Sequence, residues 1–274
     1  MTPSETGSAV RSKSRSPLVA RPLRLPGQSV QEELDRTLED EFLPYLLAAG
    51  VLFSVAAMEW VATWRHIPRQ PWLYSAMAAI AILLCVRQFF QIRRRVERLK
   101  LGRDGEQAVG QYLERLREDS AQVFHDVVGN SFNLDHIVLS PRGFFVIETK
   151  TWSKPAKGEA RITLDNGSLH INGNVPDRDP LAQAQAGARW LAALLQESCG
   201  KQFAVRSVVL FPGWFIEKMT ADWKTDLPWV LEPKAFPSFL RHEPVRYQME
   251  DVYLAAFHLS RYVRSVQAEN TRRR

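Results

Sequence analysis

Cysteine is scarce in this chain, which has only Cys85 and Cys199 among its 274 residues. The two share neither a metal-ligand spacing nor a redox spacing, so we expect no disulfide framework and no cysteine-based metal site. A reducing compartment is the expected environment. Internal repeats are also lacking. The first apolar run begins only at Phe42, with no clear Ala-x-Ala site after it, which argues against a cleaved signal peptide.

Basic residues only modestly outnumber acidic ones. Lys and Arg number 36 against 30 acidic residues, and the isoelectric point is about 9.5. This excess fits nucleic acid or anionic lipid as a partner, although many basic proteins bind neither. The hydrophobic share of 45% is that of a globular protein. The length allows one sizeable domain with additional segments.

The first 41 residues contain little apolar sequence. Residues 1–30 are rich in Ser, Pro and Arg, and residues 31–41 are strongly acidic with helix-forming composition. Segments with so few apolar residues cannot form a packed core. We therefore expect a disordered basic tail followed by a short acidic helix, together covering residues 1–41.

Two apolar runs follow, at residues 42–58 and 72–86, and neither contains a charged residue. A membrane-spanning helix needs about 20 predominantly apolar residues. Each run reaches that length if Glu59 or Arg87 lies near a membrane interface, where a long side chain can extend toward water. The alternative is a soluble helical hairpin, or two helices packed on the downstream domain.

Tryptophans cluster around the polar link between the runs, at Trp60, Trp64 and Trp72. Tryptophan is enriched at membrane–water interfaces. This favours the membrane interpretation: a transmembrane helical hairpin over residues 42–92, with the membrane contacted through residues 42–64 and 72–92.

Basic residues predict the orientation of this hairpin. Residues 93–103 carry six basic residues and the N-terminal tail carries five, whereas the link carries two arginines. Because basic residues stay on the cytoplasmic side, both termini and the downstream domain are expected there, at the cell membrane of a bacterium. The basic juxtamembrane linker, residues 93–101, could contact anionic headgroups or form a solvated helix face.

From residue 102 onward the pattern is that of a soluble α/β domain, expected over residues 102–215, with a C-terminal extension over residues 216–274 packed on it. Helical spacing alternates with short apolar runs and turn signals, including Asn166-Gly167 in a hairpin. The expected helices cover residues 106–116, 180–196 and 251–266. The expected strands cover residues 123–128, 133–139, 144–149, 161–164, 169–171 and 203–211.

Two acidic residues lie at the ends of two neighbouring strands, Asp135 on the first and Glu148 on the second. Side-by-side carboxylates repel each other unless a cation joins them, and oxygen ligands suit Mg²⁺ or Mn²⁺. Lys150 leaves the same face of the strand as Glu148 because strand side chains alternate. Its ammonium group could orient an attacking water and stabilise charge on a phosphate. The carbonyl of Thr149 could add a metal ligand.

This spacing alone is also compatible with a surface hairpin that carries a cross-strand Glu–Lys pair. The surrounding sequence makes the pattern specific. Four segments occur in order, at residues 102–109, 133–139, 141–152 and 179–183. Together they closely resemble the nuclease-related domain family, NERD, over roughly residues 102–211. That family is assigned to the PD-(D/E)xK superfamily. The resemblance implies a restriction-endonuclease-like α/β fold, a mixed sheet flanked by helices.

The resemblance also implies roles for five residues. Asp135 and Glu148 match the two metal-binding acids, and Lys150 matches the catalytic lysine. Glu106 matches the acid on the first helix, which can approach the metal or its waters. Gln183 matches a glutamine that holds the lysine, a water or a DNA phosphate. Asp179 stands where the family has Asn, and both residues cap helices.

Other residues with side chains capable of a functional role give less specific signals. His136 should point away from the site into a structural position, and the role of His125 is open. Trp152 and Lys154 could meet nucleic acid by stacking and phosphate contact, although Trp152 fits the rim of the core better. Tryptophans in the C-terminal region, namely Trp214, Trp223 and Trp229, are expected to pack in the core.

The function expected from this combination is Mg²⁺-dependent hydrolysis of phosphodiester bonds, in DNA, by a membrane-anchored protein. Asp135, Glu148 and Glu106 would serve the metal, and Lys150 and Gln183 would complete the catalytic set. The alternative is a catalytically inactive nucleic-acid-binding or scaffold protein that keeps the fold. A membrane-tethered role in uptake, defence or processing of nucleic acid is also compatible, because the fold alone does not determine function.

Overall fold

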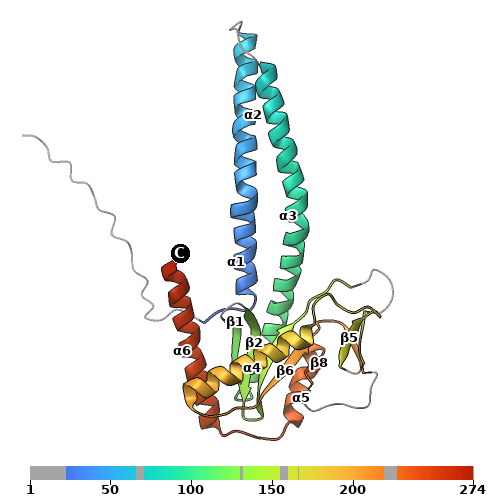
Figure 1. Cartoon of the computed structure of the whole chain (residues 1–274), viewed down its shortest axis with the longest axis vertical. Helices are drawn as coiled ribbons and strands as arrows, with labels where there is room; N and C mark the ends of the chain where they lie inside the picture. The colour runs from blue at the N-terminus through green and yellow to red at the C-terminus, as the bar shows by residue number, and fades with distance from the viewer. Residues whose placement is uncertain are drawn as a thin grey trace, which may run out of the picture.

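The structure is a computed structural model that describes residues 23–65, 71–129, 132–154, 160–165, 167–218 and 227–273. Most of the predicted tail, most of the link in the hairpin, Asn166 and Trp223 lie outside these residues. A long helical hairpin stands on an α/β domain, as Figure 1 shows.

The hairpin consists of two long antiparallel helical segments. The first comprises α1 (Gln28–Arg36), the π-helical η1 (Thr37–Phe42) and α2 (Leu43–Trp64), which follow one another without a break. The second is α3 (Pro71–Glu114), extended by η2 (Arg115–Arg117). The apolar halves of both segments are long and apolar enough to cross a membrane, and little of their surface is buried. They stand clear of the α/β domain (Figure 1), so they do not pack on it.

The charged halves of these segments pair with each other. Arg95 on α3 forms ion pairs with Glu33 on α1, at 2.9 Å, and with Glu41 on η1, at 2.8 Å. Arg103 donates a hydrogen bond to Gln31 over 2.7 Å. Residues 93–101, expected as a linker, therefore form part of α3, because Arg, Lys, Glu and Leu are good helix formers and the acidic α1–η1 segment lies beside them.

The main sheet has five strands in the order β1-β2-β3-β6-β8. The first three, β1 (Gln122–Val128), β2 (Asn133–Ser140) and β3 (Gly143–Thr149), are antiparallel. Strands β6 (Val205–Leu210) and β8 (Trp229–Leu231) add in parallel beside β3. The expected mixed sheet is thus confirmed.

Strand β3 is the centre of the domain, and all seven of its residues are buried. Phe144 and Val146 face α4 (Pro180–Cys199) and α6 (Met249–Arg273). Phe145 and Ile147 face the end of α3, together with η3 (Pro233–Ala235) and α5 (Phe236–His242). A strand buried on both faces reads as a continuous apolar run, which explains the sequence of β3.

A smaller sheet lies beside the first, in the order β5-β4-β7. It contains β4 (Arg161–Asp165), β5 (Ser168–Ile171) and β7 (Phe215–Lys218). The predicted hairpin of β4 and β5 is present, and β7 joins β4 in parallel. Residues 216–274 therefore contribute strands to both sheets as well as α5 and α6.

The segment before α1 fastens the base of the hairpin to the α/β domain. The guanidinium of Arg24 pairs with the buried carboxylate of Asp126 over 2.6 Å, and the backbone N–H of Ser29 donates to the same oxygen over 2.9 Å. Asp126 has a φ of 49°, a left-handed conformation that Asp and Asn tolerate better than most residues. Pro26 lies against Gly110 of α3, where a side chain would collide with it.

We expect the substitution Arg24→Gln to lower the free energy of unfolding by roughly 3–5 kcal/mol, because it leaves the buried Asp126 carboxylate without its charged partner. Asp126→Asn, which suits the same φ, should have a comparable effect. Thermal unfolding of the full chain in detergent measures both. The control is Arg36→Gln, because Arg36 is exposed and 4.0 Å from Glu32, and its loss should cost about 1 kcal/mol or less. Equal effects at positions 24 and 36 would contradict the assignment.

Candidate active site

The predicted lysine and one predicted acid lie at the end of β3. Glu148 is buried in the strand, and Lys150 follows the strand with its side chain on the same face. The ammonium nitrogen of Lys150 lies 2.7 Å from Glu148 Oε1 and donates to Gln183 Oε1 over 2.9 Å. The structure thus brings these three residues together. A lysine held between two oxygens has a fixed position, as a catalytic ammonium requires.

Helix α4 supplies Gln183 through its N-terminus. The side chain of Asp179 accepts a hydrogen bond from the Leu181 N–H over 2.8 Å, and Pro180 occupies the first turn. This is a regular N-cap, so Asp performs the capping role expected of Asn. The cap fixes the start of α4, and Gln183 therefore faces Lys150 from the first turns of the helix.

The other predicted acid, Asp135, lies on β2 beside Glu148. Because His136 pairs with Ile147 in an antiparallel register, Asp135 and Glu148 lie opposite each other on the two neighbouring strands. Asp135 Oδ2 accepts a hydrogen bond from the Thr149 N–H over 2.7 Å. Burial raises the pKa of Asp135 well above its usual range, and the Glu148 and Glu106 carboxylates raise it further. Burial also raises the pKa of Glu148, although Lys150 opposes this.

Glu106 approaches the same site from α3. The preceding Gly105 makes this possible, because a Cβ there would overlap Thr151 Oγ1 and lie 2.7 Å from Thr151 Cβ. Burial, followed by the carboxylates of Asp126 and Glu148, raises the pKa of Glu106 to about 8. The charge of Lys150 partly opposes this rise in the pKa, and a hydrogen bond from the backbone of Gly27 opposes it to a smaller extent. The segment before the hairpin therefore contacts the third acid of the site directly.

The donor set fits a hard divalent cation. Carboxylates that raise one another's pKa are stabilised in their charged form by a shared cation. Among the described residues, no three His, Cys, Asp or Glu side chains converge closely enough to enclose a metal ion by themselves. Mg²⁺ retains several waters and needs only one or two protein carboxylates, which Asp135 and Glu148 provide. Coordination of a cation by Asp135, Glu148 or Glu106 stays a prediction.

The two histidines of the sheet form a separate buried chain on the face toward α3. The Nδ1 atoms of His125 and His136 are 2.8 Å apart, and His125 Nε2 lies 2.7 Å from Glu114 Oε1. Burial lowers the pKa of His125, and burial lowers that of His136 well below its usual range. His136 is fully buried in the sheet, in agreement with the expected structural position. His125 belongs to the same network.

Trp152 packs against Phe211 and Trp214, with ring centroids 5.1 and 6.5 Å apart. It lies at the edge of the core, where the sequence placed it. Trp214 and Trp229 are buried as expected. Lys154 is exposed beyond the end of β3, close to Gly213.

Sequence reasoning missed the residues that fasten the segment before α1 to the domain near Glu106. Arg24, Gly27 and Asp126 are remote from the acidic motif, and Arg24 lies 102 positions before its partner Asp126. The only local signal is the Pro26-Gly27 pair, which favours a turn. It gives no indication of the partner.

The raised pKa of Glu106 predicts a dependence of stability on pH when divalent cations are absent. A carboxyl group whose pKa is about 8 in the folded protein and ordinarily 4.5 binds its proton more tightly in the folded state. Its stabilising contribution is complete below about pH 4.5 and is lost as the pH rises through 8. Glu106→Gln should therefore weaken the fall in melting temperature between pH 6 and pH 9, measured in EDTA. Part of the pH dependence should remain in this variant, because the pKa values of Asp135 and Glu148 are also raised. The exposed Glu118→Gln serves as the control, and parallel curves for the wild type and Glu106→Gln would contradict the prediction.

Comparison with known proteins identifies the domain that carries this site. No curated protein and no solved structure matches the chain. A family model does match: residues 101–212 correspond to the nuclease-related domain, NERD. The matched residues begin in α3 just before Glu106 and end just after β6, so they include Asp135, Glu148, Lys150 and Gln183. Residues 101–212 of this chain are therefore a nuclease-related domain.

Proposed function

We propose that the chain is a membrane-anchored nuclease that hydrolyses phosphodiester bonds in DNA, with Mg²⁺ as its cofactor, on the cytosolic side of the membrane. The observation that carries this proposal is the set of contacts at the end of β3. There Lys150 is held by Glu148 and Gln183, and Asp135 lies beside them inside a nuclease-related domain.

Each residue has a defined task in this proposal. Asp135 and Glu148 hold the cation from two strands, and the Thr149 carbonyl is a further candidate ligand. Bound Mg²⁺ would supply a Lewis acid that polarises the phosphate and makes water more acidic. Lys150 orients the attacking water and stabilises negative charge that develops on the phosphate. Gln183 keeps Lys150 in place. Glu106 accepts hydrogen bonds from waters at the site.

The apolar hairpin supports the membrane part of the proposal. Large apolar side chains point outward from both helices, including Leu47, Phe53, Leu83 and Phe90. Soluble proteins rarely expose so large an apolar surface. The basic residues lie at the domain end of the hairpin, which favours a cytosolic domain. From residue 93 to Glu106, α3 rises by about 20 Å at 1.5 Å per residue. The site would therefore lie close beneath the membrane surface.

The test is a cleavage assay on the full chain in detergent or nanodiscs. Linear, circular, single-stranded and branched DNA would be incubated with Mg²⁺, with Mn²⁺ and with EDTA. We expect cleavage of at least one substrate with either metal and none with EDTA. Cleavage that persists in EDTA would contradict the metal requirement. Metal-dependent DNA binding without cleavage of any substrate would overturn the nuclease proposal in favour of a binding or scaffold protein that retains the fold.

A further inference from the structure

Three arginines form an exposed stripe on α3, at the end of its apolar span. Arg87, Arg94 and Arg98 are separated by seven and four residues, so at about 100° per residue they lie within about 40° of one another on the helix surface. Arg95, which pairs with the acids of α1 and η1, lies on a neighbouring face. The three arginines, which we call the basic stripe, therefore lie beside the packed face of α3 and are open to the surroundings.

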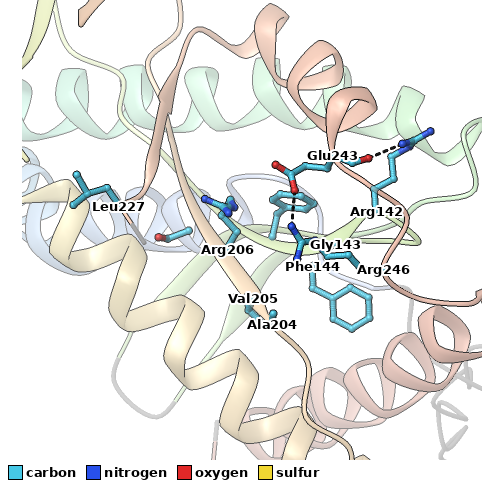
Figure 2. A pocket seen from close by; sticks show the side chains of 11 residues that line it. Arg142, Gly143, Phe144, Ala204, Val205, Arg206, Leu227, Glu243 and Arg246 are labelled. Carbon is cyan, nitrogen blue, oxygen red and sulfur yellow. Dashed lines mark hydrogen bonds and ion pairs between the residues drawn. The ribbon is translucent and has the colours of Figure 1, made fainter. Parts of the chain in front are cut away.

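The basic stripe has no acidic partner among the described residues. Arg98 donates a hydrogen bond to the backbone carbonyl of Arg94, one turn before it, over 3.3 Å. Arginines elsewhere in the chain are occupied by acids. Arg142 and Arg246, for example, are held by the backbone carbonyl and the carboxylate of Glu243, over 2.6 and 3.2 Å, as the dashed lines in Figure 2 mark. The charges of the stripe are thus available to an anion from outside the chain.

The position of the basic stripe matches the headgroup layer of a bilayer. Phe90 is the last strongly exposed apolar side chain of the span, at 59%. At 1.5 Å per residue, Arg94 lies about 6 Å and Arg98 about 12 Å beyond it. The headgroup layer is about 5–8 Å thick on each side, and charges act over about 8 Å beyond it at physiological ionic strength. Arg87 lies within the span, and its long side chain can extend to the same layer.

This position favours lipid over nucleic acid as the anionic partner. Guanidinium groups pair with phosphate whichever molecule carries it. The basic stripe begins inside an apolar span, however, so a DNA backbone bound along it would have to lie on the bilayer surface. The cytosolic leaflet is negatively charged and attracts basic residues beside a membrane span, whereas it repels the phosphates of DNA. An anionic phospholipid is therefore the matching partner.

Two exposed acids of η1, Glu39 and Asp40, lie at the same end of the hairpin and oppose this attraction. Neither forms an ion pair with the basic stripe within the described part of the chain. Glu39 follows the buried Thr37 by two residues, about half a turn, so it points away from α3. Salt screens charges over about 8 Å, whereas one helix with its side chains is about 10–12 Å across. The acids therefore weaken the attraction without cancelling it.

We propose that the basic stripe binds the headgroup of an anionic phospholipid in the cytosolic leaflet. Arg94 contacts the phosphate, Arg87 reaches the same headgroup from the span, and Arg98 adds attraction from the cytosolic side. This proposal rests on the membrane anchoring in the proposed function and not on the nuclease activity. A bound lipid would hold this part of α3 at the membrane surface.

The test measures lipid binding to the full chain in detergent by native mass spectrometry. The probes are phosphatidylglycerol and phosphatidylcholine with the same acyl chains. Phosphatidylglycerol should bind at least about tenfold more tightly, because each arginine near an anionic headgroup contributes about fivefold. The preference should shrink as the salt concentration rises. Equal binding of the two lipids would overturn the proposal.

Variants locate the lipid on the basic stripe. Arg94→Gln should weaken phosphatidylglycerol binding about fivefold, and glutamine at all three positions should abolish the preference. Lysine at all three positions should retain it, which distinguishes loss of charge from loss of structure. Arg115→Gln, exposed in η2, is the control and should bind like the wild type. Wild-type phosphatidylglycerol binding by the triple glutamine variant, together with weaker binding of duplex DNA, would assign the stripe to nucleic acid and overturn the proposal.

A second measurement separates this proposal from the anchoring on which it rests. The wild type and the triple glutamine variant are mixed with liposomes of phosphatidylcholine alone and tested for flotation at high salt. Both should float, because the apolar spans are unchanged. Failure of the wild type to float would remove the anchor and this proposal together. Flotation without any preference for phosphatidylglycerol would overturn the lipid site and leave the anchor intact.

Discussion

Replacing Lys150 with Ala is expected to lower the rate of DNA cleavage by about a hundred- to a thousandfold, the usual cost of losing one preorganised group that stabilises the transition state. Lys150 contacts both Glu148 and Gln183, so no other described side chain can take its position between these oxygens without rearrangement. Its removal also withdraws the charge that opposes the raised pKa of Glu148. The measurement is single-turnover cleavage at saturating Mg²⁺.

Two further variants distinguish a catalytic effect from a general loss of positive charge. Lys150→Arg keeps the charge but replaces a compact ammonium with a planar guanidinium, so it should recover little activity. Lys234→Ala removes a lysine from η3, which lies beside Arg115 and Asp119 at the C-terminal end of α3, beyond Glu106. It should cleave at the wild-type rate. Equal activity of Lys150→Ala and Lys234→Ala, with both proteins folded, would remove Lys150 from the mechanism.

A methyl group at Gly105 should have the largest structural effect at the site. The Cβ of Gly105→Ala would overlap the side chain of Thr151, directly after Lys150, and α3 would have to move away from the end of β3. Overpacking of this kind costs about 1–3 kcal/mol of folding free energy. The same movement would withdraw Glu106 from the site, so cleavage should fall together with the melting temperature.

The chain offers a close control for this prediction. Gly102 lies in the same helix, but a Cβ there would meet no atom within 4 Å. Gly102→Ala should therefore stabilise the protein by up to about 1 kcal/mol, because Ala is the better helix former. Thr151→Gly should partly rescue Gly105→Ala in a double-mutant cycle. Additive effects of these two substitutions would show that the clash does not occur.

The acidic site was predictable because its parts are local or carry a family signature. Asp135 and Glu148 lie on strands joined by a tight turn, so their register follows from the turn and from the buried face. Lys150 follows from the alternation of strand side chains. Gln183 and Glu106 come from distant helices, and only the resemblance to the nuclease-related domain indicated their positions. The metal-binding and catalytic roles remain predictions.

The attachment of the hairpin was not predictable in the same way. Asp126 occupies a left-handed conformation in β1. Its partner Arg24 precedes it by 102 residues, and the entire hairpin lies between them in the sequence. Periodicity carries no information on such a contact. The dense charges of residues 93–101 suggested a linker. The acidic segment that pairs with them lies before the hairpin in sequence, so the local sequence carried no sign of this partner. The parallel pairing of β7 with β4 is similarly non-local.

The unbroken course of α3 has one further consequence. Because a single helix contains both an apolar span and Glu106, the direction in which each apolar side chain points is fixed relative to the acidic site. Inserting one residue near position 98 would turn the span by about 100° relative to Glu106 and lengthen the helix by 1.5 Å. Arg95 would keep its register with Glu33 and Glu41, whereas Arg103 on the other side of the insertion would lose its register with Gln31 of α1. The hairpin and Glu106 are thus rigidly connected through one helix. Twisting or tilting the hairpin would therefore change the position of Glu106.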